Sequence, residues 1–271
     1  MPEFVYFGTP EVARDTLAAL LEHDFTPTLV VTSPDALRGR GLVLTPSPVK
    51  ELALAHSIPV LSPERLDSAA ITEIAACGAD YGICVAYGKI FPEELITSFP
   101  KGVLNVHYSL LPKYRGATPL ETALLLGESE TGVTVQKMVK EMDAGDILAQ
   151  KSTLIGAGET ARELRPRLIT LGAELLIPAL PAFLQGKATF IPQDASLATR
   201  AYKIKKEDGE LDLNAPGALN WNKYRAYADS IGTYFFENGK RMKITSAEYT
   251  KGEFRVLRVI PEGKREVAYA H

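Results

Sequence analysis

Short apolar runs alternate with segments of helical periodicity along the first half of the chain. The pattern predicts buried strands at residues 4–7, 28–31, 59–61, 81–85 and 103–107, and helices at residues 10–22 and 49–56. Strands joined by helical segments are typical of right-handed crossovers, which produce a parallel sheet covered on both faces. The first half therefore predicts a Rossmann-like α/β domain with a mostly parallel sheet.

The turn after the first strand reads Gly8-Thr9-Pro10. Thr9 is predicted to cap the following helix, and Pro10 suits its first turn because proline has no amide hydrogen to leave unpaired. The glycine pattern of a dinucleotide-binding turn is absent there, and no phosphate-binding Gly-Lys-Ser/Thr loop occurs in the sequence. Residues 33–48 are rich in glycine and proline and are predicted to form a loop.

In the second half of the chain, the sequence pattern changes near residue 190. Before that point, it predicts a helix at 119–126, a strand at 131–138 and a long helix at 160–184 that Pro166 and Pro178 are expected to interrupt. Further on, β-like runs at 232–236, 241–244 and 254–257 are separated by turns. We therefore predict a catalytic domain over 1–190, a linker over 191–203, and a small β-rich domain over 204–271, OB-like but shortened.

Composition and charge narrow the class of protein. An apolar content of 46% and a charged content of 23% are those of a soluble globular protein, and no secretory signal or membrane-spanning run is evident. The two cysteines, Cys77 and Cys84, give no disulfide framework and no zinc-binding spacing, so we expect a cytoplasmic protein. Residues 200–271 hold 14 basic and 10 acidic residues of the chain's 30 and 33, so a basic tail follows an acidic front. Such a tail favours an anionic partner, although chance surface variation would look the same.

Candidate chemistry lies where the predicted strand at 103–107 ends. Asn105 and His107 are two residues apart, so their side chains share one face, and ligands of parallel sheets bind beyond such strand ends. An amide and an imidazole there can donate hydrogen bonds to an oxygen that gains negative charge. Asp143, after the strand at 131–138, could add a carboxylate. A hydrogen-bonded strand end and an ordinary Asp-Gly turn remain the alternative interpretation.

The chain resembles the folate-dependent formyltransferases over residues 3–212. The motifs that carry the resemblance are Phe7-Gly8-Thr9-Pro10, Pro46-Ser47-Pro48-Val49-Lys50, Val85-Ala86-Tyr87-Gly88, Asn105-Val106-His107 with Ser109-Leu110-Leu111-Pro112, Arg115-Gly116-Ala117, Glu130-Thr131-Gly132-Val133-Thr134 and Asp143-Ala144-Gly145-Asp146. The Asn-x-His motif with Ser-Leu-Leu-Pro and the distant aspartate is specific for the superfamily. Pro-Ser-Pro-Val-Lys and Arg-Gly-Ala narrow the resemblance to the branch that acts on tRNA.

The resemblance implies transfer of a formyl group from 10-formyltetrahydrofolate to the amine of methionine on initiator tRNA. It implies that Asn105, His107 and Asp143 are catalytic and that neither a metal nor a covalent intermediate is needed. We expect the protein to act as a monomer and away from membranes.

Binding residues follow from the same resemblance. The folate is expected to lie against Lys89, Ile90, Phe91, Ser109, Leu110, Leu111 and Pro112. Arg40 matches the loop arginine that reaches the acceptor stem of the tRNA. The loop departs from the tRNA branch at Gly41-Leu42-Val43-Leu44, where related enzymes often carry lysines, and the tail after Asp212 is shorter than usual.

Three other functions remain open at this point. The same catalytic trio could formylate a nucleotide-linked amino sugar or glycinamide ribonucleotide, or it could hydrolyse formyltetrahydrofolate with water in place of the amine. The third alternative is a non-enzymatic RNA-binding module, against which the acidic first domain argues.

Overall fold

The fold is that of a computed structural model, which describes residues 2–38, 41–228 and 230–269. The chain divides into two compact units, each assembled from separate stretches of sequence. The first unit comprises residues 1–115, 132–152 and 167–199, and the second comprises residues 116–131, 153–166 and 200–271.

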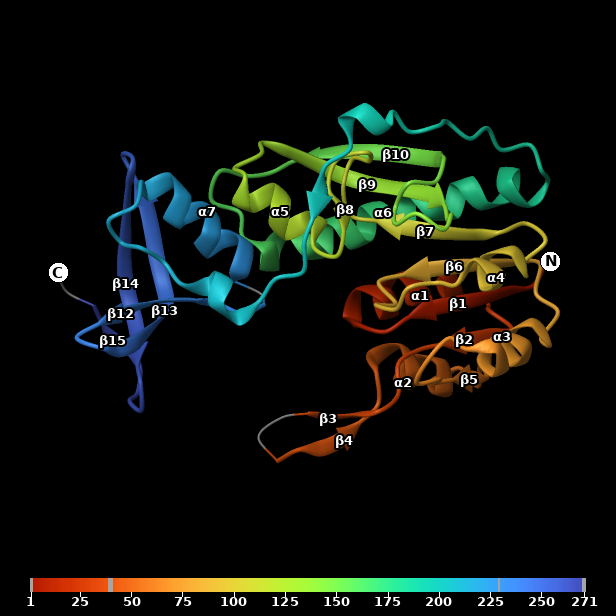
Figure 1. Cartoon of the computed structure of the whole chain (residues 1–271), viewed down its shortest axis with the longest axis horizontal. Coiled ribbons are helices and arrows are strands. Elements are labelled where there is room, and N and C mark those ends of the chain that lie inside the picture. Colours follow the sequence, from red (N-terminus) through yellow and green to blue (C-terminus); the bar gives the residue numbers. More distant parts are fainter. Residues whose placement is uncertain (1, 39–40, 229, 270–271) are drawn as a thin grey trace. The chain divides into compact units, whose positions relative to one another are not determined.

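A seven-stranded sheet with the order β10-β9-β7-β6-β1-β2-β5 organises the first unit, counted over the described residues (Figure 1). Its strands are β1 (Phe4–Gly8), β2 (Leu29–Val31), β5 (Val60–Leu61), β6 (Tyr81–Val85), β7 (Val103–His107), β9 (Glu130–Lys137) and β10 (Ile147–Leu154). The five strands from β7 to β5 pair in parallel, whereas β9 runs antiparallel to β7. The prediction of a mostly parallel α/β sheet is confirmed.

The central strands are apolar on both faces because both faces are covered. Every residue of β1 and of β6 is buried. At one end of β1, the Phe7 ring packs edge-on against the rings of Tyr87, Phe91 and Phe99, with centroid distances of 5.8, 4.9 and 6.1 Å. This aromatic cluster fixes the segment that follows β6, next to the end of β7.

Helices connect the strands of this sheet. They are α1 (Glu11–Glu22), α2 (Pro48–Ala55), α3 (Ser68–Ala75), α4 (Glu93–Thr97) and α6 (Ala161–Leu184). Gly8 lies where α1 approaches β1 closely, since a Cβ there would be 2.6 Å from Cβ of Ala13. A Cβ on Gly172 of α6 would be 3.2 Å from Val106 of β7, so α6 packs tightly against the strand that carries Asn105 and His107.

Among the described helices, only α6 is long and apolar enough to span a bilayer by length and composition. Its buried residues include Leu164, Leu168, Leu176 and Leu180, each with no exposed surface. The ring of Phe183 also packs against Tyr81 of β6, at 5.7 Å between centroids. One face of α6 therefore packs in the protein core, which is a common reason for such apolarity.

Three local predictions from the sequence were wrong. Thr9 does not cap α1, because its hydroxyl contacts Ser33 Oγ at 3.1 Å and donates to the Tyr87 carbonyl at 3.2 Å. Residues 33–48 are not a plain loop, since β3 (Ala36–Arg38) pairs antiparallel with β4 (Val43–Thr45). The prolines do not interrupt α6, because the apolar side chains that it buries compensate for the missing backbone hydrogen bonds.

The second unit is built on an antiparallel sheet with the order β12-β13-β14-β15. Its elements are α5 (Pro119–Leu125), α7 (Gly217–Tyr227), β12 (Thr233–Glu237), β13 (Lys240–Thr250), β14 (Glu253–Pro261) and β15 (Val267–Ala268). Asn238 and Gly239 both have positive φ at the β12–β13 turn, as a tight hairpin requires. The predicted small β-rich domain is confirmed, although α7 was missed.

The remaining elements are short. They are β8 (Arg115–Gly116), which pairs with β11 (Arg200–Ala201), and two 3₁₀ turns at Ala195–Leu197 and Lys206–Gly209. The core of the second unit contains Leu211, Phe235, Met242, Ile244, Val256 and Val259.

The different burial of two leucines in helices predicts that their replacement by alanine will change stability to different extents. Leu17 in α1 has no exposed surface, whereas Leu54 in α2 is 58% exposed. Leu17→Ala should lower the free energy of unfolding by about 2–5 kcal/mol, because it removes a buried side chain and leaves a cavity. Urea denaturation followed by circular dichroism measures this loss. Leu54→Ala is the matched control, and an equal loss in both variants would contradict the assignment of Leu17 to the core.

Candidate active site

Two side chains of the candidate site come from β7. Asn105 and His107 alternate with the buried Val106, so both point to the face that Val106 does not occupy. Cys84 of β6 is the register partner of Asn105, and Gln136 of β9 is its partner on the other side. The site therefore lies across three neighbouring strands.

Asp143 reaches this face from the loop between β9 and β10. The loop folds back so that Lys137 N donates to the Asp146 carbonyl at 2.9 Å. Gly145 allows that fold, because a Cβ there would lie 1.6 Å from the Lys137 carbonyl oxygen. Asp143 itself has a φ of 53°, a left-handed conformation that costs free energy in a residue with a side chain. The backbone is thus held in an unfavourable conformation at the residue whose carboxylate enters the site.

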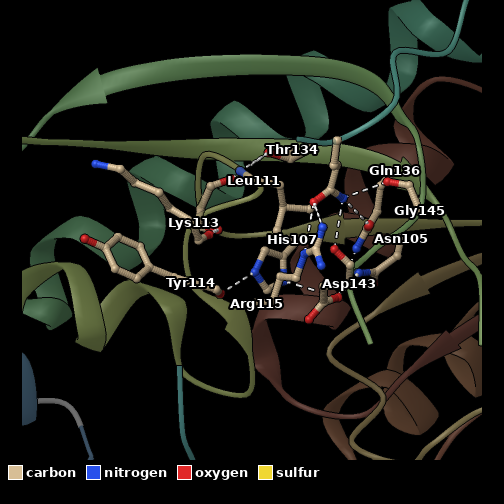
Figure 2. A network of polar contacts seen from close by, with 12 residues as sticks. Asn105, His107, Leu111, Lys113, Tyr114, Arg115, Thr134, Gln136, Asp143 and Gly145 are labelled. Atoms are coloured by element: carbon tan, nitrogen blue, oxygen red, sulfur yellow. Dashed lines mark hydrogen bonds and ion pairs between the residues drawn. The ribbon is translucent and has the colours of Figure 1, made fainter. Parts of the chain in front are cut away.

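The three predicted residues converge on one carboxylate oxygen (Figure 2). Asn105 Nδ2 donates to Asp143 Oδ1 at 3.3 Å, and His107 Nδ1 lies 3.6 Å from the same oxygen. The side chains of His107 and Asp143 are only 6% and 13% exposed. An amide, an imidazole and a carboxylate therefore meet in a region that is largely shielded from water.

The other nitrogen of His107 determines where the ring carries its proton. His107 Nε2 lies 2.9 Å from the Tyr114 carbonyl oxygen, which can only accept a hydrogen bond. Nε2 must therefore be protonated, and Nδ1 is the nitrogen that faces Asp143. Consequently, Nδ1 can donate a hydrogen bond only when the ring is an imidazolium.

The Tyr114 carbonyl is positioned by a residue from the predicted linker. Thr199 accepts from Tyr114 N through its hydroxyl at 2.8 Å and from Arg115 N through its carbonyl at 2.9 Å. Thr199 N in turn donates to the Pro112 carbonyl at 3.3 Å. The segment near residue 199 therefore sets the orientation of His107 indirectly.

Two glutamines of the site were missed by the sequence analysis. Gln136 donates to Asp143 Oδ1 at 2.9 Å, and Gln193 donates to the carbonyls of Asp143 and Gly145 at 2.9 and 2.7 Å. A signal existed for Gln136, because an amide within the apolar strand 131–138 is buried and needs partners. Gln193 carried no such signal, since it lies in a segment with no periodic pattern.

The loop after β7, which holds the predicted folate contacts Ser109 to Pro112, is fixed by hydrogen bonds. The Thr134 hydroxyl donates to the Ser109 carbonyl at 2.6 Å and accepts from Leu111 N at 3.2 Å. Gln150 of β10 donates to the Leu111 carbonyl at 2.9 Å and to Thr134 Oγ1 at 2.8 Å. Leu110 is half-buried and Leu111 is buried. The backbone of this loop is therefore a preformed surface beside His107.

The other predicted folate contacts follow β6, the strand beside β7. Lys89 Nζ donates to the carbonyls of Pro63 and Glu64, and burial lowers the pKa of its ammonium group against the opposing charge of Glu64. Ile90 is 79% exposed, and Phe91 is buried against Phe7. The side chains of Lys89 and Phe91 are therefore engaged within the protein, whereas the side chain of Ile90 is exposed.

The nucleophiles near the site are held in unreactive forms. Burial raises the pKa of the Cys84 thiol to about 12, and the charge of Asp143 adds to this effect against an opposing hydrogen bond from the Tyr87 backbone. The Ser109 hydroxyl donates to the Lys113 carbonyl at 2.6 Å. A thiol without thiolate character and a hydroxyl bonded to a carbonyl are poor nucleophiles, so the geometry favours direct transfer over a covalent intermediate.

Arg40, the predicted tRNA contact, lies outside the residues that the structure describes. Within the described residues, no group of three or more His, Cys, Asp and Glu side chains is arranged to hold a metal ion.

Comparison with known families identifies the family of the chain. The formyl transferase family matches residues 3–180, and the formyl transferase C-terminal domain matches residues 203–264. The chain therefore belongs to the formyl transferase family.

Individual relatives show to which branch of the formyl transferase family the chain belongs. A methionyl-tRNA formyltransferase of Bdellovibrio bacteriovorus is 42% identical over 249 residues, covering 91% of this chain and 78% of the relative. Another, of Streptococcus thermophilus, is 37% identical over 272 aligned residues, covering 100% of this chain and 87% of the relative. Within the family, the chain falls in the branch of the methionyl-tRNA formyltransferases, as the resemblance of its motifs predicted.

Solved structures show the shared fold. An N-formyltransferase from Helicobacter canadensis, in complex with folinic acid and dTDP-3-aminofucose, superposes with a TM-score of 0.67 at 19% identity over 100% of both chains. A likely sugar N-formyltransferase from Mycobacterium tuberculosis has a TM-score of 0.67 at 21% identity, covering 98% of this chain and 100% of that one.

The Asp143 loop predicts that Gly145 tolerates no side chain. Gly145→Ala should lower the free energy of unfolding by about 1–3 kcal/mol, because the methyl group would overlap the Lys137 backbone. It should also slow formyl transfer, since Asp143 is two residues away. Chemical denaturation and an activity assay measure the two effects. Gly158→Ala is the control, because a Cβ there meets nothing within 4 Å; equal behaviour of the two variants would contradict this account of the loop.

Proposed function

We propose that this chain transfers the formyl group of 10-formyltetrahydrofolate to the amino group of methionine on initiator tRNA, for translation initiation. The observation that supports the proposal is the convergence of Asn105, His107 and Asp143 on one oxygen, on a chain that belongs to the methionyl-tRNA formyltransferase branch. We place the reaction in the cytoplasm and assign it to a single chain, because all three side chains come from one unit.

The protein must stabilise an anionic oxygen and transfer a proton during this reaction. The amine attacks the formyl carbon, the carbonyl oxygen becomes an anion, and the bond from carbon to N10 of the folate then breaks. Asn105 Nδ2, and His107 Nδ1 when it carries a proton, are the donors for that anion, and the low exposure around them strengthens such hydrogen bonds. The proton that the amine loses must reach N10 of the folate. The amine nitrogen and N10 would both lie near the Asp143 carboxylate.

Asp143 has two roles in this mechanism. Its carboxylate oxygen, 3.6 Å from His107 Nδ1, orients that ring nitrogen. Its carboxylate accepts the proton of the attacking amine, directly or through one water molecule, and passes it to the leaving nitrogen. The proton count then balances without a metal or a covalent intermediate.

The folate is expected to lie against the rigid loop of Ser109 to Pro112 and the backbone from Lys89 to Phe91. Both segments follow the carboxyl ends of adjacent parallel strands, which is the usual ligand position in such sheets. The hydrogen bonds of Thr134 and Gln150 to the Ser109–Leu111 backbone support this role, because they fix the loop before any ligand binds.

A formylation assay tests the proposal. The purified chain should formylate charged initiator tRNA when supplied with 10-formyltetrahydrofolate. His107→Ala should reduce the rate by about 100-fold or more, the usual cost of losing an oxyanion donor. His56→Ala is the matched control, because His56 is exposed at the end of α2 and should leave the rate unchanged. Near-normal turnover of His107→Ala would contradict the mechanism.

The same assay separates the other acceptors. A nucleotide-linked amino sugar, glycinamide ribonucleotide and water replace the charged tRNA in parallel reactions. Formylation of the sugar or the ribonucleotide without any on tRNA would overturn the proposed acceptor, as would release of formate at a comparable rate without an acceptor.

We also propose that Arg40 contacts a phosphate of the tRNA acceptor stem. Arg40→Ala should raise the KM for tRNA, leave the KM for the folate unchanged and reduce the slope of log affinity against log salt by about 1, as expected for one lost phosphate contact. Arg14→Ala on α1 removes an equal charge from a residue that is paired with Asp15 and serves as the control. Equal effects in both variants would show that only net charge matters.

A further inference from the structure

Gln136 is a buried amide near the end of β9, the strand that leads into the Asp143 loop. It is 1% exposed and lies between Val135 and Lys137, the last residue of the strand. Because it pairs in register with Asn105, its side chain lies on the same face as Asn105 and reaches the same carboxylate oxygen. Its contact to Asp143 Oδ1, at 2.9 Å, is shorter than those from Asn105 and His107, at 3.3 and 3.6 Å.

The direction of each hydrogen bond around Gln136 is determined by chemistry. Arg115 can only donate, and its Nε and Nη2 lie 3.1 and 2.7 Å from Gln193 Oε1. The amide nitrogen of Gln193 therefore faces the carbonyls of Asp143 and Gly145, and also Gln136 Oε1 at 3.2 Å. Gln136 must in turn direct its own NH₂ group towards Asp143.

These hydrogen-bond donors fix both the backbone and the side chain of Asp143. Gln193 holds the backbone carbonyls on either side of the left-handed turn, and Gln136 holds the side-chain oxygen. Without Gln136, the carboxylate could rotate about its side-chain bonds while the loop stayed in place. The distance between Asp143 Oδ1 and His107 Nδ1 would then lose its shortest restraint, leaving the 3.3 Å hydrogen bond from Asn105.

We propose that Gln136 is a positioning residue that orients the Asp143 carboxylate towards His107 and Asn105 for catalysis. This inference rests on the proposed function, because it assigns a task to Asp143 in formyl transfer. Gln136 touches neither substrate; it acts through Asp143, with Gln193 and Arg115 setting the orientation of its amide.

Two substitutions test the role of the donor group. Gln136→Met keeps the length and removes the N–H donor, so kcat should fall by about 10- to 100-fold, the range expected for one hydrogen bond to a charged group. The KM values for folate and tRNA should stay within about twofold of wild type, because the lost interaction aids the reaction and not binding. Gln185→Met is the matched control, since Gln185 is exposed.

Gln136→Glu gives a second readout that a merely structural role would not produce. A glutamate anion repels Asp143, whereas a protonated glutamic acid can donate a hydrogen bond to it. The kcat of Gln136→Glu relative to wild type should therefore rise as the pH falls. The ratio cancels the pH dependence that both proteins share, and it needs no comparison of their stabilities.

The outcomes separate this inference from the proposed function. A normal kcat for Gln136→Met, or a pH-independent ratio for Gln136→Glu, overturns the role of Gln136 if His107→Ala and Asp143→Asn are strongly impaired. Normal rates for His107→Ala and Asp143→Asn overturn the proposed mechanism itself. A fall in kcat with unchanged KM values, together with a ratio that rises at lower pH, supports the inference.

Discussion

The negative charge of Asp143, held at one point beside β7, is the constraint on which the candidate site depends. A carboxylate that is 13% exposed needs donors, and Gln136, Asn105 and His107 approach the same oxygen from two strands. Each of these groups owes its position to backbone structure. Asn105 and Gln136 are opposed because β7 and β9 pair antiparallel in that register, and the loop can return because Gly145 has no side chain. A shift in the pairing register would separate Gln136 from Asn105 and His107.

The sheet and the tight packing of its neighbours hold this arrangement. β6 and β7 are parallel, so the segments that follow them lie at the same edge, and the aromatic cluster around Phe7 fixes the first of these segments. Thr134 and Gln150 fix the second through its backbone. The proposed folate surface is therefore rigid, whereas the loop that carries Asp143 depends on side-chain amides. The preorganisation of the site is divided between backbone pairing and a short chain of polar side chains.

The sequence predicted the parts of the fold that depend on local pattern. The strands at 81–85 and 103–107 were predicted with their observed bounds, because short, mostly apolar runs between turn residues leave little choice. The sequence did not predict the β3–β4 hairpin, whose apolar residues Leu37, Val43 and Leu44 are exposed, or α3, whose pattern is short. Thr9 looked like a helix cap, but tertiary contacts to Ser33 and Tyr87 compete for its hydroxyl.

Some residues of the candidate site were predicted from the sequence, and others were missed. Asn105, His107 and Asp143 were identified because their types and motif spacing indicate chemistry. Gln136 was passed over as part of a strand, and Gln193 as part of a linker. Their roles depend on the antiparallel register of β9 and on a contact between residues 50 positions apart, Gln193 and Asp143. Such contacts become visible only in three dimensions.

One consequence of the bond between His107 and the Tyr114 carbonyl concerns the route of protons. With Nε2 committed to that carbonyl, the ring offers a single working nitrogen and cannot pass a proton in at one side and out at the other. The imidazole is thus a terminus rather than a relay. In the proposed mechanism, the proton of the attacking amine therefore passes by way of the Asp143 carboxylate and not through the ring of His107.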